Sequence, residues 1–116
     1  MKRRYLVILF LLAAALPLKA AMVVSALSGA KAFPNPWRVD KHSNTSIKFA
    51  GMPGASVVKI FTVSGHEVKQ LSADSQGQVP WDRTNTSGEL VASGVYIYLI
   101  IDPQGNETSG KLAIIR

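Results

Sequence analysis

The sequence predicts an all-β fold, an immunoglobulin-like β-sandwich of about seven short strands preceded by an amino-terminal signal helix. Short apolar runs rich in β-branched and aromatic residues recur through residues 32–116, as they do in strands. Clusters of glycine, proline, asparagine, aspartate and serine separate these runs at short intervals. No stretch of residues 32–116 has the apolar spacing of an amphipathic helix. These three features together are typical of a small two-sheet sandwich.

Alternation and turn residues define the individual strands. Ile47 and Phe49 alternate with polar residues, which predicts a half-buried strand. Residues 94–101 are apolar on both faces, which predicts a central strand. The alternation in residues 56–63 fails near its end, so a bulge is expected near Thr62. The predicted strands are 44–50, 56–63, 66–71, 79–81, 89–92, 94–101 and 111–116, with a tight turn at Ser64-Gly65 and a hairpin loop at 102–106.

The amino-terminal segment is typical of an export signal. Residues 1–31 are predicted to be a signal peptide with a short spacer, and residues 32–116 to be the domain. A basic start, Lys2-Arg3-Arg4, precedes an uncharged apolar run and then small residues. The apolar run has 14 residues, fewer than the ~20 that span a bilayer as a helix. The protein is therefore expected in the periplasm, at the cell surface or in the medium. The alternative is an uncleaved leader, through which alone the protein would contact a membrane.

Charge and cysteine content exclude several classes of function. The net charge is +6, but four of the thirteen basic residues lie in the leader. From residue 32 onward there are eight basic and seven acidic residues, without the concentrated basic face of a nucleic-acid-binding protein. No nucleic-acid partner is therefore expected. The absence of cysteine excludes disulfides, thiolate zinc sites and thiol redox chemistry.

No constellation in the sequence predicts catalysis, a cofactor or a metal centre, so the protein is expected not to be an enzyme. His66-Glu67 resembles the start of a helical zinc motif, but the second histidine is replaced by Gln70 and the segment is predicted as a strand. The serines lack the histidine and aspartate partners, in a nucleophile elbow, that a hydrolase requires.

Two groups of residues allow a binding interpretation beside a structural one. Asp82, Asn85 and Glu89 carry oxygens that suit calcium, yet they are too few and too widely spaced for a convincing loop, and Asx-capped turns are the preferred interpretation. Trp37 and Trp81 are candidate platforms for a sugar ring. The preferred interpretation places Trp81 in the core, and Trp37 either there or at a sheet edge.

The motifs of residues 32–116 resemble two overlapping families. These are the Ig-like domain of the flagellar hook-capping protein with its non-flagellar relatives, and the type A carboxy-terminal sorting domain of the type IX secretion system. The resemblance rests on four blocks: Phe33-Pro34-Asn35-Pro36, Val58 to Val68, Trp81-Asp82 through Ser93-Gly94-Val95-Tyr96-Ile97-Tyr98, and Lys111 to Arg116. The motif positions with structural roles are Pro34, Asn35, Pro36, Gly65, Trp81, Asp82, Gly88, Gly94 and Tyr96.

The resemblance implies a bacterial, seven-stranded sandwich that acts by binding other proteins. For the sorting family it implies recognition by secretion or surface-attachment machinery at the outer membrane. For the hook-capping family it implies a structural or adhesion module of an extracellular assembly. Neither role requires a cofactor, and none is expected.

Overall fold

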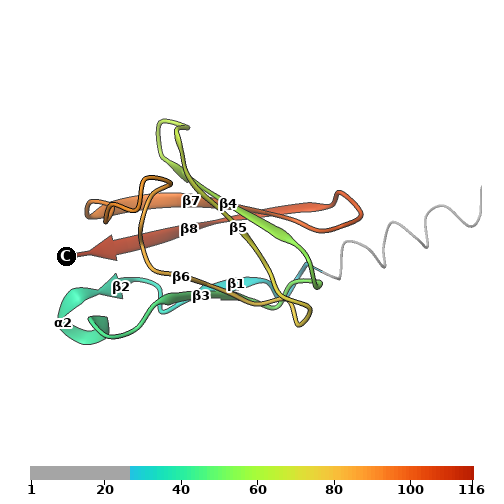
Figure 1. Ribbon diagram of the computed structural model, residues 1–116, viewed down its shortest axis with the longest axis horizontal. Helices are drawn as coiled ribbons and strands as arrows, with labels where there is room; N and C mark the ends of the chain where they lie inside the picture. The colour runs from blue at the N-terminus through green and yellow to red at the C-terminus, as the bar shows by residue number, and fades with distance from the viewer. Residues whose placement is uncertain (1–26) are drawn as a thin grey trace, which may run out of the picture.

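A computed structural model describes residues 27–116, so the greater part of the predicted signal peptide lies outside the described residues. Two β-sheets face each other and enclose a single core (Figure 1). One sheet has three strands in the order β1-β3-β6, and the other has five in the order β2-β8-β7-β4-β5. The predicted all-β sandwich is confirmed.

Most of the strands are antiparallel to their neighbours, and β2 alone among the named strands pairs in parallel, with β8. The elements of the described part are β1 (Lys31–Phe33), β2 (Trp37–Arg38), α2 (Val39–His42), β3 (Ile47–Ala50), β4 (Val57–Thr62), β5 (Glu67–Ser72), β6 (Val79–Trp81), β7 (Gly94–Ile101) and β8 (Glu107–Ile115).

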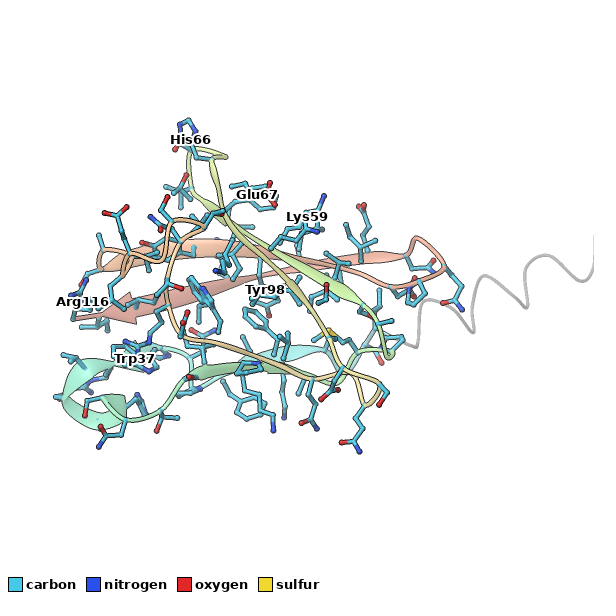
Figure 2. The ribbon with its side chains drawn as sticks, in the orientation of Figure 1. Trp37, Lys59, His66, Glu67, Tyr98 and Arg116 are labelled. Atoms are coloured by element: carbon cyan, nitrogen blue, oxygen red, sulfur yellow. The ribbon has the colours of Figure 1, made fainter. Side chains whose placement is uncertain are left out.

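Strand β7 is the centre of the larger sheet, as residues 94–101 were expected to be. It pairs with β8 on one side and β4 on the other over nearly its whole length. Because successive side chains of a strand point to opposite faces, Tyr96, Tyr98 and Ile100 are buried against the smaller sheet. Figure 2 shows Tyr98 between the two layers.

The core joins side chains of both sheets. Phe49 of β3 meets Tyr98 edge to face, with ring centroids 5.2 Å apart. Gly110, which pairs with Tyr98 across β7 and β8, leaves space for the phenol ring, since a β-carbon there would overlap it. Leu27 is also buried, so packing begins upstream of residue 32. The other buried apolar residues are Ala32, Trp37, Ile47, Met52, Val58, Ile60, Ala73, Trp81, Val91, Tyr96, Ile100, Leu112 and Ile114.

The predicted strand at 89–92 is wrong. This segment makes only an isolated bridge, between Thr84 and Leu90, and otherwise belongs to a loop. The side chain of Asn85 accepts the backbone N–H of Glu89 at 3.0 Å, while the N–H of Val91 bonds to the carbonyl of Arg83 at 2.9 Å. The bond from Val91 belongs to the bridge itself, together with the bond from the N–H of Asn85 to the carbonyl of Glu89 at 2.8 Å. The side chain of Asn85 then ties Glu89 into the turn, and pairing does not extend beyond this bridge.

Three short elements were not predicted. Strands β1 and β2 have three and two residues, lengths at which alternation carries no signal. Helix α2 is a single turn, in which the Nδ1 atom of His42 accepts the N–H of Arg38 at 3.0 Å. Strand β8 also begins at Glu107 instead of Lys111, because Asp102 holds a tight hairpin at 102–106 and pairing starts directly after it.

The irregularity expected near Thr62 lies one step earlier. The register of β4 and β5 shifts between Ile60 and Phe61, and the extra residue is Val68 on β5. The carbonyl of Val68 accepts hydrogen bonds from the backbone N–H and the hydroxyl of Thr86, at 3.1 and 3.2 Å. The bulge thereby attaches the loop after β6 to the edge of the larger sheet.

Candidate functional site

Several of the motif residues gather at the end of the sandwich that holds the carboxy-terminal strand, β8. Figure 2 places Trp37 and Arg116 at this end. We define the strand clamp as the residues that hold β8 or the chain directly after it, either themselves or through Trp37. They are Asn35, Trp37, Arg83 and Arg116.

Asn35 fixes the outer edge of β8. Its side-chain amide donates to the carbonyl of Lys111 at 2.9 Å and accepts the N–H of Ala113 at 3.1 Å. These are the bonds that a neighbouring strand would make, so the Asn35 side chain continues the parallel pairing of β2 with β8. Pro34 and Pro36 flank it, each after a cis peptide bond, and have no N–H to offer a ladder.

Trp37 seals the same end of the core. Its side chain is 1% exposed, and its Nε1 donates to the carbonyl of Thr45 at 2.7 Å. The guanidinium of Arg83 lies 3.8 Å from the Trp37 ring centroid, a cation–π contact between residues far apart in the chain. Burial lowers the pKa of Arg83, as does the positive charge of Arg116, while Asp82 opposes the shift.

Arg116 anchors the end of β8 to the loop that precedes β7. Its backbone N–H donates to the Ser93 hydroxyl at 2.9 Å, and its guanidinium donates to the carbonyl of Val91 at 2.9 Å. Gly94 pairs with Ile114 beside these bonds. The last strand is thus held from both of its sides.

Trp81 and Tyr96 support the clamp from within the core. Trp81 is 1% exposed, donates from Nε1 to the carbonyl of Thr84 at 2.9 Å, and meets Tyr96 edge to face at 6.2 Å. The Tyr96 hydroxyl donates to the carbonyl of Ala92 at 2.6 Å. This bond, from the start of a strand to the backbone a few residues upstream, resembles the tyrosine corner of immunoglobulin-type sandwiches.

The calcium candidates serve as turn residues. Asp82 accepts the backbone N–H and hydroxyl of Thr84, and this hydroxyl bond is the largest cause of the lowered pKa of Asp82. Asn85 accepts the N–H groups of Ser87 and Glu89, both at 3.0 Å. These contacts are those of Asx turns, the preferred interpretation of the sequence. Within residues 27–116 no three histidine, cysteine, aspartate or glutamate side chains are grouped as a metal site.

The remaining motif glycines occupy turns. Gly65 and Gly88 have φ angles of +94° and +83°, a region that residues with a β-carbon rarely adopt. Gly65 closes the β4–β5 hairpin, and His66 lies beside it at the hairpin tip (Figure 2). His66 and Glu67 are therefore on a hairpin, where no helical zinc motif can form.

One open hollow of about 440 Å³ lies between the β4–β5 hairpin and the loop after β6. Its lining includes Glu67, Leu90 and Tyr96. The lining residues provide no nucleophile paired with a base and no pair of carboxylates, so this hollow offers no constellation for acid–base or covalent catalysis.

Solved structures of similar fold include two bacterial proteins. The chain matches no protein-family profile, and no curated protein sequence matches it significantly. The first structure is PorZ of Porphyromonas gingivalis, described as an essential bacterial surface component of the type IX secretion system. Its TM-score is 0.68 with 30% identity, over 79% of this chain and 12% of PorZ. The second is dimeric latent PorU of the same organism, with a TM-score of 0.52 and 26% identity, over 74% of this chain and 9% of PorU.

The fold thus occurs as one domain of a type IX secretion component, and the chain spans a small fraction of either protein. The likeness supports the type IX part of the sequence resemblance at the level of the fold. Within residues 27–116, no helix is long and apolar enough to cross a membrane.

Sequence reasoning missed the Arg83 and Arg116 contacts of the clamp. Arg83 is 46 positions from Trp37, and no local pattern signals a stack between residues so distant. The φ of +66° at Arg83 is also unexpected for a residue other than glycine. The side chains of Trp37 and Arg83 meet only through the tertiary fold.

Alkaline unfolding should report on Tyr96. Burial raises the pKa of Tyr96, so the unfolded chain loses this proton near pH ~10 while the folded chain still holds it. Its contribution to stability is therefore present below pH ~10 and lost as pH rises further. We expect Tyr96→Phe to show a shallower loss of urea midpoint above pH ~10 than the unmodified chain. Identical slopes for the two proteins would contradict this assignment.

Proposed function

We propose that the protein is an exported, non-enzymatic module recognised by protein components of a type IX secretion or surface-attachment machinery. The observation that carries the proposal is the likeness to a domain of PorZ, at 30% identity over 79% of the chain. The leader predicted from residues 1–31 supports export.

The use of the motif residues supports a binding role. Asn35, Trp37 and Arg116 hold β8, and Trp81 and Tyr96 fill the core behind it. Their polar atoms are engaged in structural bonds, so none of them is placed to react with a substrate. A module of this kind acts by presenting a firmly held surface and strand edge to another protein.

A secretion assay tests the proposal. A reporter with a cleavable export signal is joined to residues 27–116 and produced in a bacterium with a working type IX system and in the same strain without it. The reporter should reach the cell surface or the medium in the first strain alone. The reporter without the module is the control, and periplasmic retention in both strains would contradict the proposal.

The second candidate function is a structural or adhesion module of a surface assembly. It is favoured by the description of PorZ as a surface component. In this case the intact chain should remain bound at the cell surface when no reporter is attached. Fractionation of cells that produce the tagged chain tests this second function: retention at the cell surface supports it, and a chain found only in the periplasm or the medium contradicts it.

A further inference from the structure

The outward side of the larger sheet carries an apolar surface, on which Val95 is exposed and Ile97, Leu99 and Ile101 are half-buried. Tyr96, Tyr98 and Ile100 of β7 point inward, so the intervening residues of this strand point outward. Every one of the intervening residues is apolar, and Val95 is 47% exposed. They are Val95, Ile97, Leu99 and Ile101.

Strand β4 continues this surface. Phe61 pairs with Ile97, and Val57 pairs with Ile101, so two apolar rows cross from β7 to β4 on the same side. We define the outer face as Val57, Phe61, Val95, Ile97, Leu99 and Ile101. On β4 Lys59 lies between Val57 and Phe61 on this side and pairs with Leu99, so the unbroken apolar stripe is that of β7. An unbroken apolar stripe on a surface strand is typical of a contact surface.

Opposite charges border the outer face. Lys111 on β8 pairs with Ile97, while Glu67 on β5 pairs with Phe61. A single cross-strand row therefore runs Lys111, Ile97, Phe61, Glu67, with a positive charge at one border and a negative charge at the other. Both charged residues are exposed, and neither takes part in the ion pair found in the described part, between Arg38 and Asp40. Figure 2 shows Glu67 and Lys59 on the side away from the smaller sheet.

We propose that a second copy of this chain covers the outer face, related by a two-fold axis parallel to the strands. Such an axis reverses the order of the strands, so that β8 of one copy lies over β5 of the other. It leaves positions along the strands unchanged, so each cross-strand row of one copy faces the same row of the other. Lys111 of each copy then faces Glu67 of the other, and Ile97 of each faces Phe61 of the other. Two ion pairs border one apolar contact, as a two-fold interface of like surfaces requires.

Charge distribution favours this arrangement over other occupants. Glu107 on β8 also borders this side, since it pairs with Ile101. A two-fold axis across the strands, through the row of Lys59, would place Lys111 opposite Glu107 but would bring Lys59 against Lys59. The axis along the strands instead places Lys59 opposite Leu99, along which its methylene groups can lie. A uniformly acidic partner or an anionic lipid surface would pair with Lys111 and repel Glu67. The inference does not depend on a role in type IX secretion.

Charge-reversal variants test the dimer. The full chain is produced in a bacterial host that exports it, and the exported protein is purified. Sedimentation over a range of concentrations should show a monomer–dimer equilibrium. Lys111→Glu, or Glu67→Lys, should raise the dimer dissociation constant by about tenfold, because each change replaces two attractions with two repulsions. The double variant Lys111→Glu/Glu67→Lys should restore the original constant. Lys41→Glu, which changes the same charge on α2 away from the outer face, is the matched control.

Several outcomes of these measurements would contradict the proposed dimer. A chain that stays monomeric at every concentration would overturn the proposal. So would a dimer whose dissociation constant is unchanged in both single variants, or is not restored in the double variant. A monomer that floats with phosphatidylglycerol vesicles would instead assign the outer face to lipid. Circular dichroism of each variant shows whether it keeps the fold, and the double variant keeps the test decisive where one single variant does not.

Discussion

Trp81→Ala is expected to lower the free energy of unfolding by about 3–5 kcal/mol. The substitution removes a side chain that is 1% exposed and leaves a cavity between the two sheets. It also removes the edge-to-face contact with Tyr96 and leaves the carbonyl of Thr84 without its indole donor. Because small domains are stable by only about 5–15 kcal/mol, the variant should be at the margin of folding at room temperature.

Urea denaturation followed by circular dichroism measures this effect, with Leu90→Ala as the control. Leu90 belongs to the same loop region and is 54% exposed, so its truncation should change the free energy of unfolding by less than about 0.5 kcal/mol. Similar losses for the two variants would show that Trp81 is not a main support of the core. Should Trp81→Ala fail to fold, Trp81→Phe keeps most of the buried ring and should give an intermediate loss.

The sandwich could be predicted because its long elements carry strong local signals. Residues 94–101 are apolar on both faces, and such a run of eight fits a strand covered on both sides by neighbours. The turn at Ser64-Gly65 and the loop at 102–106 were equally clear, because a positive φ and an Asx turn each require particular residues. Alternation also predicted a half-buried strand with Ile47 and Phe49 on one face, and both side chains are buried.

The clamp could not be predicted as a site because its contacts are long-range. The sequence marked Asn35 as a motif position, but its partners on β8 are 76 and 78 positions away. The strand predicted at 89–92 failed for the opposite reason, since local bonds from Asn85 outweighed the β-propensity of Leu90 and Val91. Local pattern thus decides the long strands, and tertiary contacts decide the short ones.

Asn35→Ala tests whether the Pro-Asn-Pro segment fastens the last strand, and it should lower the free energy of unfolding by about 1–3 kcal/mol. Two hydrogen bonds are lost, one to the carbonyl of Lys111 and one from the N–H of Ala113. Because these groups lie near water, the cost stays well below that of an unpaired group in the core. Hydrogen exchange should show faster loss of protection at Ala113 than elsewhere in β8.

Asn35→Asp distinguishes the two bonds. The carboxylate still accepts the N–H of Ala113, but an oxygen replaces the NH₂ group and faces the carbonyl oxygen of Lys111. The loss should therefore equal or exceed that of the alanine variant at neutral pH, although the aspartate is closer to asparagine in shape. Asn44→Ala is the matched control, since Asn44 is exposed in the turn before β3. If the aspartate variant were as stable as the unmodified chain, the donor bond to β8 would contribute nothing to fastening the strand.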